Sequence, residues 1–370
     1  MVQWKMSRIA ILDTKIHPGH LRCKKFYSYS VCGEPEKEQA QETSHGTVCA
    51  RVLDYFTSDY ELYNIQILKN RRNTDEKPMG DIQHLKKGMQ LCLELDVDIV
   101  CMSAVSSLLS DSNVMYETAK ELSQKSILLA ALDNKRYVTV PASYPFVMGV
   151  QSDTKNCLAP GELAYNPSDL FGVGMYANCK IGLLFELSCA PSNSFAVPAA
   201  AARFNTWKNK GSHIEMELRN LRPYPSYGID EEITFKRGSG FYKELPLAVF
   251  YITKEADVYA VCQRAMDELY NKYFVQSAVL CSMKSGTDIR FRKLDSIANL
   301  KQELLFMECC YKTDLLFLMV EEHNREQVRM QVEADLEITL HGDRIKILSE
   351  EGCVKGGAKD LSDLVYQILQ

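Results

Sequence analysis

The chain has 370 residues, of which 46% are hydrophobic and 25% are charged, and its formal net charge is -5. This length permits two domains with sizeable cores. The charge balance has no basic surplus that would indicate nucleic acid, and no apolar run approaches the roughly 20 residues of a membrane span. A strand is predicted almost directly after Met1 and leaves no room for a secretory signal, so we expect a cytoplasmic protein.

The thirteen cysteines are odd in number and irregular in spacing, and the sequence contains no Cys-x-x-Cys pair. Most of them lie in apolar runs, where a reduced thiol packs as a small hydrophobic group. A zinc site would need paired ligands at fixed spacing. We therefore expect free thiols and no metal site.

The first 205 residues predict strands that alternate with helices. The predicted strands are residues 9–12, 60–68, 97–102, 126–132 and 147–150, and the predicted helices are residues 48–56, 80–95 and 113–123. Such alternation is typical of a mainly parallel sheet with helices on both faces. The Pro- and Gly-bearing residues 152–178 permit no assignment.

From about residue 205 the pattern changes. Residues 206–245 give weak strand signals at best, and we predict a linker or excursion there. Residues 246–370 predict a smaller α/β accessory domain. Its strands are residues 247–252, 275–282 and 314–320, its helices are residues 257–272, 294–309 and 361–369, and a hairpin is predicted at residues 336–348. Whether this domain binds substrate or forms an oligomer stays open.

Three polar residues stand where sites are often built. Asp13 follows the strand at residues 9–12, and the carboxyl edge of a parallel sheet is a common place for a site. His45 opens a helix beside Gly46, which permits close backbone approach. Ser194 precedes an alanine-rich helix, whose amides and dipole favour an oxyanion. Each also has a structural interpretation: a turn, a surface residue and a helix cap.

The order Asp13, His45, Ser194 is that of the subtilisin version of the Ser-His-Asp triad. Around these residues the sequence resembles the subtilisin-like serine peptidase family. The resembling segments are residues 11–14 for the Asp motif, 44–47 for the His motif, 193–198 for the Ser motif, 129–134 for the Ala-Ala-Gly-Asn segment, and 138–150 after it. The resemblance covers residues 8–205 and implies a subtilisin-like catalytic domain at residues 1–205.

This resemblance implies hydrolysis of peptide bonds through an acyl-enzyme. Ser194 would attack the carbonyl, His45 would move its proton to the leaving amine, and Asp13 would orient the imidazole. Asn134 would donate a hydrogen bond to the oxyanion. The chemistry requires no metal or organic cofactor, and the partner is a peptide or protein substrate.

The resemblance also implies the walls of the primary specificity pocket. The lining residues are Ser103, Ala104, Val105, Ala131, Leu132 and Asp133. Val105 and Ser106 stand where the family usually has two Gly, so they should narrow the substrate channel. Asp133 also replaces a Gly, and we hypothesise that its carboxylate favours Lys or Arg on the acyl side of the cleaved bond. A local turn hydrogen bond made by Asp133 is the alternative.

The narrow channel and the accessory domain favour restricted processing, such as removal of a leader from a ribosomally made, modified peptide. Departures from the family motifs keep a second function open. Lys15 replaces Gly, Asn193 replaces Thr and Asp133 replaces Gly, and these changes favour a catalytically silent, peptide-binding protein. The complete set of triad and oxyanion residues favours the enzyme. An unrelated α/β protein with accidental motifs is the third hypothesis.

Overall fold

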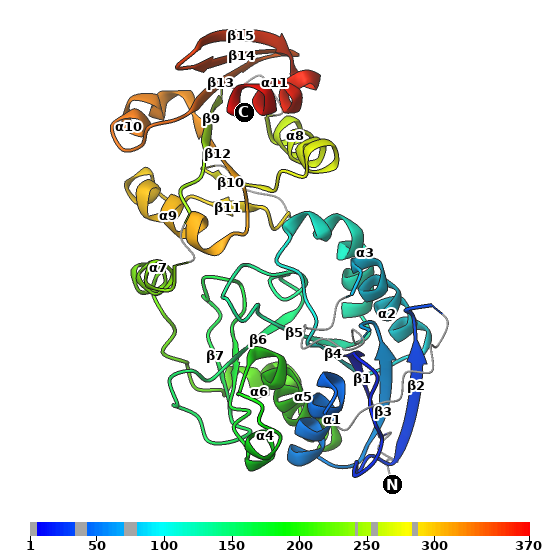
Figure 1. Ribbon diagram of the computed structural model, residues 1–370. Coiled ribbons are helices and arrows are strands. Elements are labelled where there is room, and N and C mark those ends of the chain that lie inside the picture. Colours follow the sequence, from blue (N-terminus) through cyan, green and yellow to red (C-terminus); the bar gives the residue numbers. More distant parts are fainter. Residues whose placement is uncertain (1–5, 34–42, 70–79, 241–242, 253–257, 283–287) are drawn as a thin grey trace. The chain divides into compact units, whose positions relative to one another are not determined.

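The computed structural model of the chain describes residues 6–33, 43–69, 80–240, 243–252, 258–282 and 288–370 (Figure 1). The chain divides into two compact units. The N-terminal unit comprises Met1–Ser106 and Asp111–Ser226, and the C-terminal unit comprises Ser107–Ser110 and Tyr227–Gln370. The predicted domain boundaries at residues 205 and 246 stay a prediction.

The N-terminal unit is built on a sheet with the strand order β2-β3-β1-β4-β5-β6-β8-β7. Its strands are β1 (Ser7–Asp13), β2 (Lys25–Ser30), β3 (Tyr60–Gln66), β4 (Ile99–Met102), β5 (Ile127–Ala131), β6 (Met148–Ser152), β7 (Leu163–Tyr165) and β8 (Met175–Ala177). Neighbouring strands are parallel except β7 and β8. This mainly parallel sheet confirms the predicted α/β class.

Helices cover both faces of this sheet (Figure 1). They are α1 (His45–Phe56), α2 (Ile82–Glu94), α3 (Ser112–Ser123), α4 (Gly182–Glu186), α5 (Asn193–Asn209) and α6 (Ile214–Arg219). Ile9 and Ile11 of β1 share a core with α1 and α5, whereas Leu12 lies against Gly88 of α2. Successive strand side chains point to opposite faces, so α1 and α5 cover one face and α2 covers the other.

The alanine-rich helix α5 runs through the centre of the unit. Residues 199–202 are each at most 1% exposed, and α5 lies against β4, β5 and β6. Because alanine presents only a methyl group, the helix backbone can approach the sheet closely. The predicted buried helix after Ser194 is therefore confirmed.

Several short elements were not predicted from the sequence. The strand β2 lies at the edge of the sheet, and its polar and aromatic residues are mostly exposed or half-buried. The strands β7 and β8 have three residues each and lie in the segment 152–178 that the sequence left unassigned. Such short strands form because β8 pairs with β6 and β7 pairs with β8, and local sequence does not encode these pairings.

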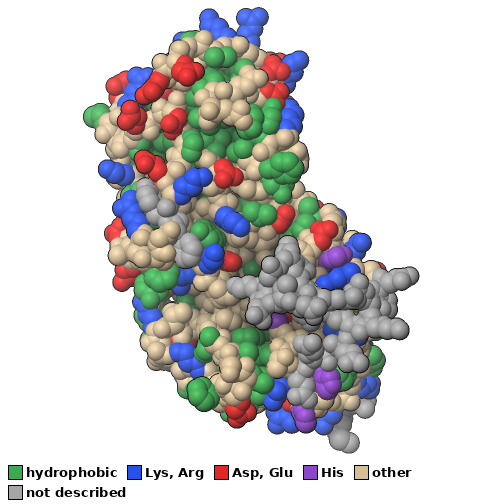
Figure 2. Space-filling model, in the orientation of Figure 1, with side chains coloured by type: hydrophobic (Ala, Val, Ile, Leu, Met, Phe, Trp, Pro, Cys, Tyr) green, Lys and Arg blue, Asp and Glu red, His purple; other side chains and the backbone are tan. Residues whose placement is uncertain are grey.

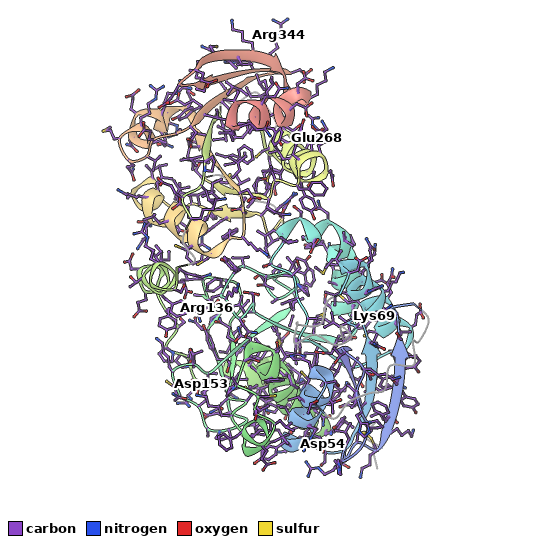
Figure 3. The ribbon with its side chains drawn as sticks, viewed as in Figure 1. Asp54, Lys69, Arg136, Asp153, Glu268 and Arg344 are labelled. Atoms are coloured by element: carbon purple, nitrogen blue, oxygen red, sulfur yellow. The ribbon has the colours of Figure 1, made fainter. Side chains whose placement is uncertain are left out.

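Side-chain contacts fix this irregular segment. Asp153, labelled in Figure 3, follows β6 and accepts hydrogen bonds from the amides of Cys157 (3.1 Å) and Leu158 (2.9 Å). The Tyr224 hydroxyl donates to the same carboxylate at 2.8 Å, and the Tyr224 ring stacks on Tyr176 with centroids 3.7 Å apart. These contacts hold the chain that follows β6 against the sheet.

The C-terminal unit has a second sheet, with the strand order β11-β10-β12-β9-β13-β14-β15. Its strands are β9 (Leu247–Ile252), β10 (Ser277–Cys281), β11 (Phe291–Lys293), β12 (Leu315–Glu321), β13 (Leu336–His341), β14 (Arg344–Ser349) and β15 (Gly352–Gly357). The five neighbouring strands β11, β10, β12, β9 and β13 run parallel to one another. The strands β14 and β15 continue the sheet in antiparallel pairing. The predicted hairpin is β13 and β14, and β15 was not predicted.

Helices cover both faces of this sheet too. They are α7 (Ile229–Gly238), α8 (Val258–Tyr273), α9 (Leu300–Cys310), α10 (Arg325–Arg329) and α11 (Leu361–Leu369). Ala248 and Phe250 of β9 share a core with α8 and α11, while Arg325 of α10 lies over the ring of Tyr251 on the other face. The predicted linker at residues 206–245 contains α6 and α7, so the weak strand signals there were misleading.

The surface of both units mixes charged and hydrophobic side chains in the view of Figure 2. The large hydrophobic residues that are exposed are scattered along the chain: Tyr55, Phe185, Met216, Phe235, Phe274 and Met330. Among the described residues, no helix has the length and apolar character needed to cross a bilayer.

Candidate active site

The site begins at the carboxyl end of β1, where Asp13 is fully buried. Its Oδ2 lies 2.8 Å from Nδ1 of His45, and its Oδ1 lies 3.0 Å from the same nitrogen. The Thr14 amide donates to Oδ1 at 2.7 Å. The predicted Asp and His are therefore brought together as a hydrogen-bonded pair, with the carboxylate facing Nδ1 and leaving Nε2 for another partner.

His45 is the first residue of α1, and the residues around it fix the start of this helix. Ser44 is the N-cap, and its side chain accepts a hydrogen bond from the Thr47 amide. A Cβ on Gly46 would lie 2.5 Å from the Thr14 carbonyl oxygen, closer than real contacts allow. The Gly46 amide instead donates to Thr14 Oγ1 at 2.8 Å. Only glycine lets α1 begin this close to the end of β1.

Charge and burial act in opposite directions on His45. The Asp13 carboxylate raises the pKa of His45 above its usual value, and desolvation by burial opposes this effect. The side chain keeps 31% of its surface exposed, whereas Asp13 keeps none. A half-exposed imidazole beside a buried carboxylate can accept a proton from a neighbouring hydroxyl and hold the resulting positive charge.

Cys49 lies beneath this pair, one helical turn after His45. Its Sγ is 3.9 Å from both Asp13 Oδ2 and His45 Nδ1, and 3.6 Å from Ser103 Oγ. Burial raises the pKa of this thiol. Asp13, His45 and Cys49 are also the one group in the described part of the chain with three such donor atoms close enough for a metal ion. The spacing of four residues on one helix could have placed Cys49 here from sequence.

Ser194 is the second residue of α5 and is 9% exposed. Its carbonyl oxygen accepts hydrogen bonds from Ser103 Oγ at 3.0 Å and from Cys49 Sγ at 3.8 Å. The next residue, Phe195, stacks on the His45 ring with centroids 5.3 Å apart. Three segments distant in sequence therefore meet at the first turn of α5: α1, the end of β4 and α5 itself.

The Ser194 hydroxyl does not close a full triad in this structure. Within the described ranges no hydrogen bond joins it to His45, and no residue accepts a hydrogen bond from the Ser194 amide. The N-cap residue Ser192 makes no side-chain capping bond either. The first turn of α5 thus presents an unpaired amide beside the hydroxyl, where a ligand oxygen could bind.

The predicted oxyanion residue Asn134 lies at this same helix start. Its Oδ1 accepts a hydrogen bond from the Asn193 amide at 3.0 Å. The loop that carries it is held by Arg136, labelled in Figure 3, whose guanidinium lies 5.5 Å from the centre of the Phe171 ring. Asn134 is itself exposed, so its amide nitrogen is accessible to a ligand.

The predicted pocket residues border Ser194 on two sides. Ser103, Ala104 and Val105 follow β4, and the last two are partly exposed. Ala131 is the last residue of the neighbouring strand β5 and Leu132 follows it, and both are buried. The backbones of Ser106 and Val140 then pair through two hydrogen bonds of 2.9 and 2.8 Å, which join the segments that follow the two strands.

Asp133 makes the local turn hydrogen bond that was the alternative to a specificity role. Its Oδ1 accepts from the Lys135 amide at 2.8 Å, and its carbonyl oxygen accepts from the Arg136 amide. Its own amide donates to Thr139 Oγ1 at 3.2 Å. The preference for a basic substrate residue stays a prediction.

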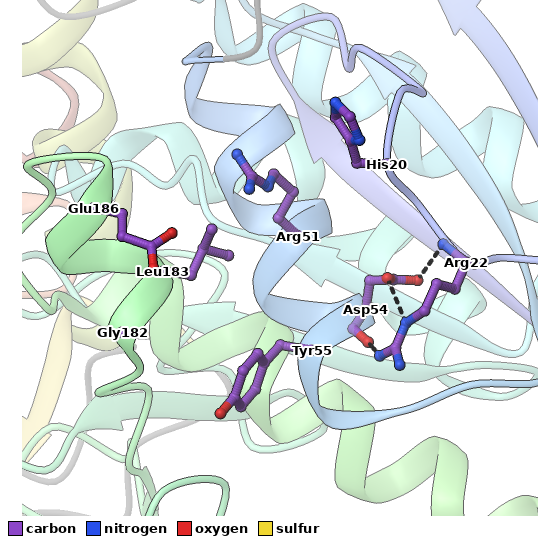
Figure 4. Close-up of a pocket in the computed structure, with 8 residues that line it drawn as sticks. All are labelled: His20, Arg22, Arg51, Asp54, Tyr55, Gly182, Leu183 and Glu186. Atoms are coloured by element: carbon purple, nitrogen blue, oxygen red, sulfur yellow. Dashed lines mark hydrogen bonds and ion pairs between the residues drawn. The ribbon is translucent and has the colours of Figure 1, made fainter.

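Two hollows of the surface contain none of the predicted site residues. One of about 560 Å³ in the N-terminal unit (Figure 4) is lined by His20, Arg22, Arg51, Asp54, Tyr55, Gly182, Leu183 and Glu186. In it, Arg22 Nε pairs with Asp54 Oδ2 at 3.0 Å. The other, of about 870 Å³, lies within the C-terminal unit and is lined by residues of α9 and α11, by the segments that lead into β9 and β13, and by the turn after β14. Neither hollow includes the first turn of α5.

The comparisons with known proteins agree with the sequence resemblance. Residues 5–228 match the model of the Subtilase family, Peptidase_S8. No curated protein matches the chain. Among solved structures, the chain is similar to the prenylagaramide maturation protease PagA, at 16% identity over 62% of this chain and 81% of that chain, with a TM-score of 0.36.

Two further solved structures are similar to the chain. One is a lanthipeptide protease, at 16% identity over 59% of this chain and 76% of that chain, with a TM-score of 0.40. The other is the self-cleaved protease domain of PatA, at 17% identity over 62% and 86%, with a TM-score of 0.34. The family match spans more than half of the 370 residues and contains Asp13, His45 and Ser194, and the chain therefore belongs to the subtilase family.

Proposed function

We propose that the chain is a serine endopeptidase that hydrolyses peptide bonds through an acyl-enzyme. The observation that carries the proposal is the hydrogen-bonded pair of buried Asp13 and half-exposed His45 at the first turn of α5, in a chain of the subtilase family. Phe195 stacks on the imidazole and Ser103 binds the Ser194 carbonyl, so the pair and the nucleophile helix are held by direct contacts.

In the proposed reaction His45 Nε2 takes the proton of Ser194 Oγ as the oxygen attacks the substrate carbonyl. The proton then passes to the leaving amine, and water repeats the sequence to release the acid. Asp13 holds the imidazole through Nδ1 and stabilises its positive charge. The apo distance between hydroxyl and imidazole is expected to tighten when substrate binds.

The oxyanion would bind at the first turn of α5. Two donors are in reach of that turn: the Ser194 amide, which no described residue uses, and the side-chain amide of Asn134. Preorganised donors of this kind act on the charge that develops in the transition state, and one is worth roughly 3 to 4 kcal/mol of barrier.

We propose restricted processing of a peptide or protein in the cytoplasm, with removal of a leader from a ribosomally made, modified peptide as the preferred setting. Support comes from the segments that border Ser194. Val105 is partly buried against the core of the N-terminal unit, and the Asp133 amide donates a hydrogen bond to Thr139 in the segment that follows β5. A branched side chain in place of glycine would leave less room for substrate side chains beside Ser194.

The test is labelling with a fluorophosphonate probe from about pH 5 to about pH 9. We expect labelling of the wild type and none of Ser194→Ala. The matched control is Ser192→Ala, which removes a hydroxyl two residues away that makes no capping bond and should label like the wild type. Labelling that survives Ser194→Ala, or a folded wild type that takes up no label, would contradict the proposal.

Within the described residues, the Ser194 hydroxyl makes no hydrogen bond to the His45 imidazole. This favours a second candidate function, a catalytically silent peptide-binding protein. Such a protein would bind peptide in the same channel, and its unlabelled wild type would still show peptide-dependent stabilisation in thermal melting. The oligomeric state and the role of the C-terminal unit are independent of this choice.

A further inference from the structure

We infer that Asn193 is a positioning residue that fixes the oxyanion donor Asn134 and the ends of two strands relative to the nucleophile Ser194. The inference rests on the proposed peptidase function. The inference gives a role to Asn193, which stands where the family motif has Thr. In the sequence, this replacement favoured a catalytically silent protein.

The Asn193 side chain joins the carboxyl ends of β5 and β6. Its Nδ2 donates to the carbonyl oxygens of Leu132 at 3.0 Å and Asp133 at 3.4 Å, and its Oδ1 accepts from the Ser152 amide at 2.8 Å. The residue is only 8% exposed. Both ends of the buried amide are therefore paired, and each pairs with a different strand.

The Asn193 backbone carries the connection to the oxyanion donor. Its amide donates to Asn134 Oδ1 at 3.0 Å. Because this bond uses the oxygen of the Asn134 side chain, it directs the Nδ2 group away from the Asn193 amide. An exposed asparagine is otherwise free to rotate, and only one orientation offers a donor to an oxyanion at the first turn of α5.

The position of that backbone amide depends on the Asn193 side chain. Residue 193 is the first residue of α5, directly before Ser194, so a shift of residue 193 moves the donor to Asn134 and the nucleophile together. The side-chain bonds to Leu132 and Ser152 prevent this shift. A Thr hydroxyl has a single oxygen and cannot hold a donor and an acceptor on two separate atoms.

The experiment is a double-mutant cycle on the full chain, read as the rate constant of fluorophosphonate labelling per folded molecule. Asn134→Ala should slow labelling by roughly 10²- to 10³-fold, and Asn193→Ala by roughly 10- to 100-fold. The double variant should label faster than the product of the two single effects predicts, because part of the effect of Asn193 passes through Asn134. The pH midpoint of labelling should stay that of the wild type, since the Asp13–His45 pair is unchanged.

The matched control is Asn205→Ala on the same helix. The Asn205 side chain is fully buried and donates to Thr57 Oγ1 at 2.8 Å and to the Ser58 carbonyl oxygen at 3.1 Å. It is three helical turns from the site, so its loss should lower the melting temperature and leave the labelling rate unchanged. Asn193→Thr, the substitution closest to the family motif, replaces Asn193→Ala if the latter does not fold.

The outcomes separate this inference from the proposed function. A wild type that takes up no label overturns both. A labelled wild type with an Asn193 variant that loses only thermal stability, as the Asn205 control does, overturns the positioning role alone. The same holds if the effects of the Asn193 and Asn134 substitutions multiply in the double variant.

Discussion

Substituting Gly46 by Ala tests how the His45 helix is joined to β1. The added Cβ would lie 2.5 Å from the Thr14 carbonyl oxygen, 3.1 Å from Thr14 Oγ1 and 3.3 Å from Asp13 Cβ. The nearest of these atoms belongs to the backbone and cannot rotate away. To reach an ordinary contact of 3.4 Å, the start of α1 must retreat by about 0.9 Å.

This retreat acts directly on the candidate triad. A displacement of that size lengthens the 2.8 Å bond from His45 Nδ1 to Asp13 beyond hydrogen-bond range. Misplacing a catalytic group by about 1 Å costs roughly 10²-fold in rate. The overpacking also costs about 1 to 3 kcal/mol of stability, which the better helix propensity of Ala offsets by up to about 1 kcal/mol.

We expect Gly46→Ala to label with fluorophosphonate roughly 10²-fold more slowly than the wild type. The control is Gly88→Ala in α2, where a Cβ would meet the side chains of Ile67 at 2.8 Å and Leu12 at 3.2 Å. It should lower the melting temperature with little change in rate, because α2 covers the opposite face of the sheet. Wild-type labelling by a folded Gly46→Ala protein would refute the reasoning.

Three further predictions follow from the protonation and the burial of the site. Labelling should rise with pH to a midpoint above about 6.5, because the Asp13 carboxylate raises the pKa of His45. The pair stabilises the fold below about pH 6.5 and loses this contribution as pH rises through the raised pKa. The melting-temperature gap to Asp13→Asn should therefore shrink with rising pH, and a gap that widens would contradict the pairing. Iodoacetamide should modify the exposed Cys157 and Cys353 of the native chain and spare the fully buried Cys49. Mass spectrometry of the alkylated peptides identifies the modified cysteines. Modification of Cys49 in the folded protein would show that reagents reach the buried side of the Asp13–His45 pair.

The parts of the fold that sequence predicts are those with strong local signals. The apolar run that ends at Asp13 predicts a buried strand, and the alanines after Ser194 predict a helix that lies close to a sheet. His45 with Gly46 predicts a helix start with close backbone approach, and the structure has that approach. In each case the residue type and its position in a periodic element suffice, because the physical constraint acts within a few residues.

Other features depend on partners distant in sequence. The strand β2 is an edge strand whose exposed residues show no clear alternation, whereas β8 pairs with the edge of β6 and β7 pairs with β8. The stacking of Phe195 on His45 joins residues 150 positions apart along the chain. No local pattern encodes such a pairing, so the contacts of the first turn of α5 needed the structure.

The departures from the family motif illustrate the same difference. Read alone, Asn193 in place of Thr counts against catalysis, since it alters the residue next to the nucleophile. In the structure its amide satisfies one carbonyl of the β5 end and one amide of the β6 end, groups that burial would otherwise leave unpaired. Asn193 thus makes hydrogen bonds to buried backbone groups and also orients the Asn134 side chain. Its replacement of Thr is therefore compatible with a working oxyanion site. Loss of function by drift would not be expected to preserve both bonds, and the double-mutant cycle measures whether they act on the reaction.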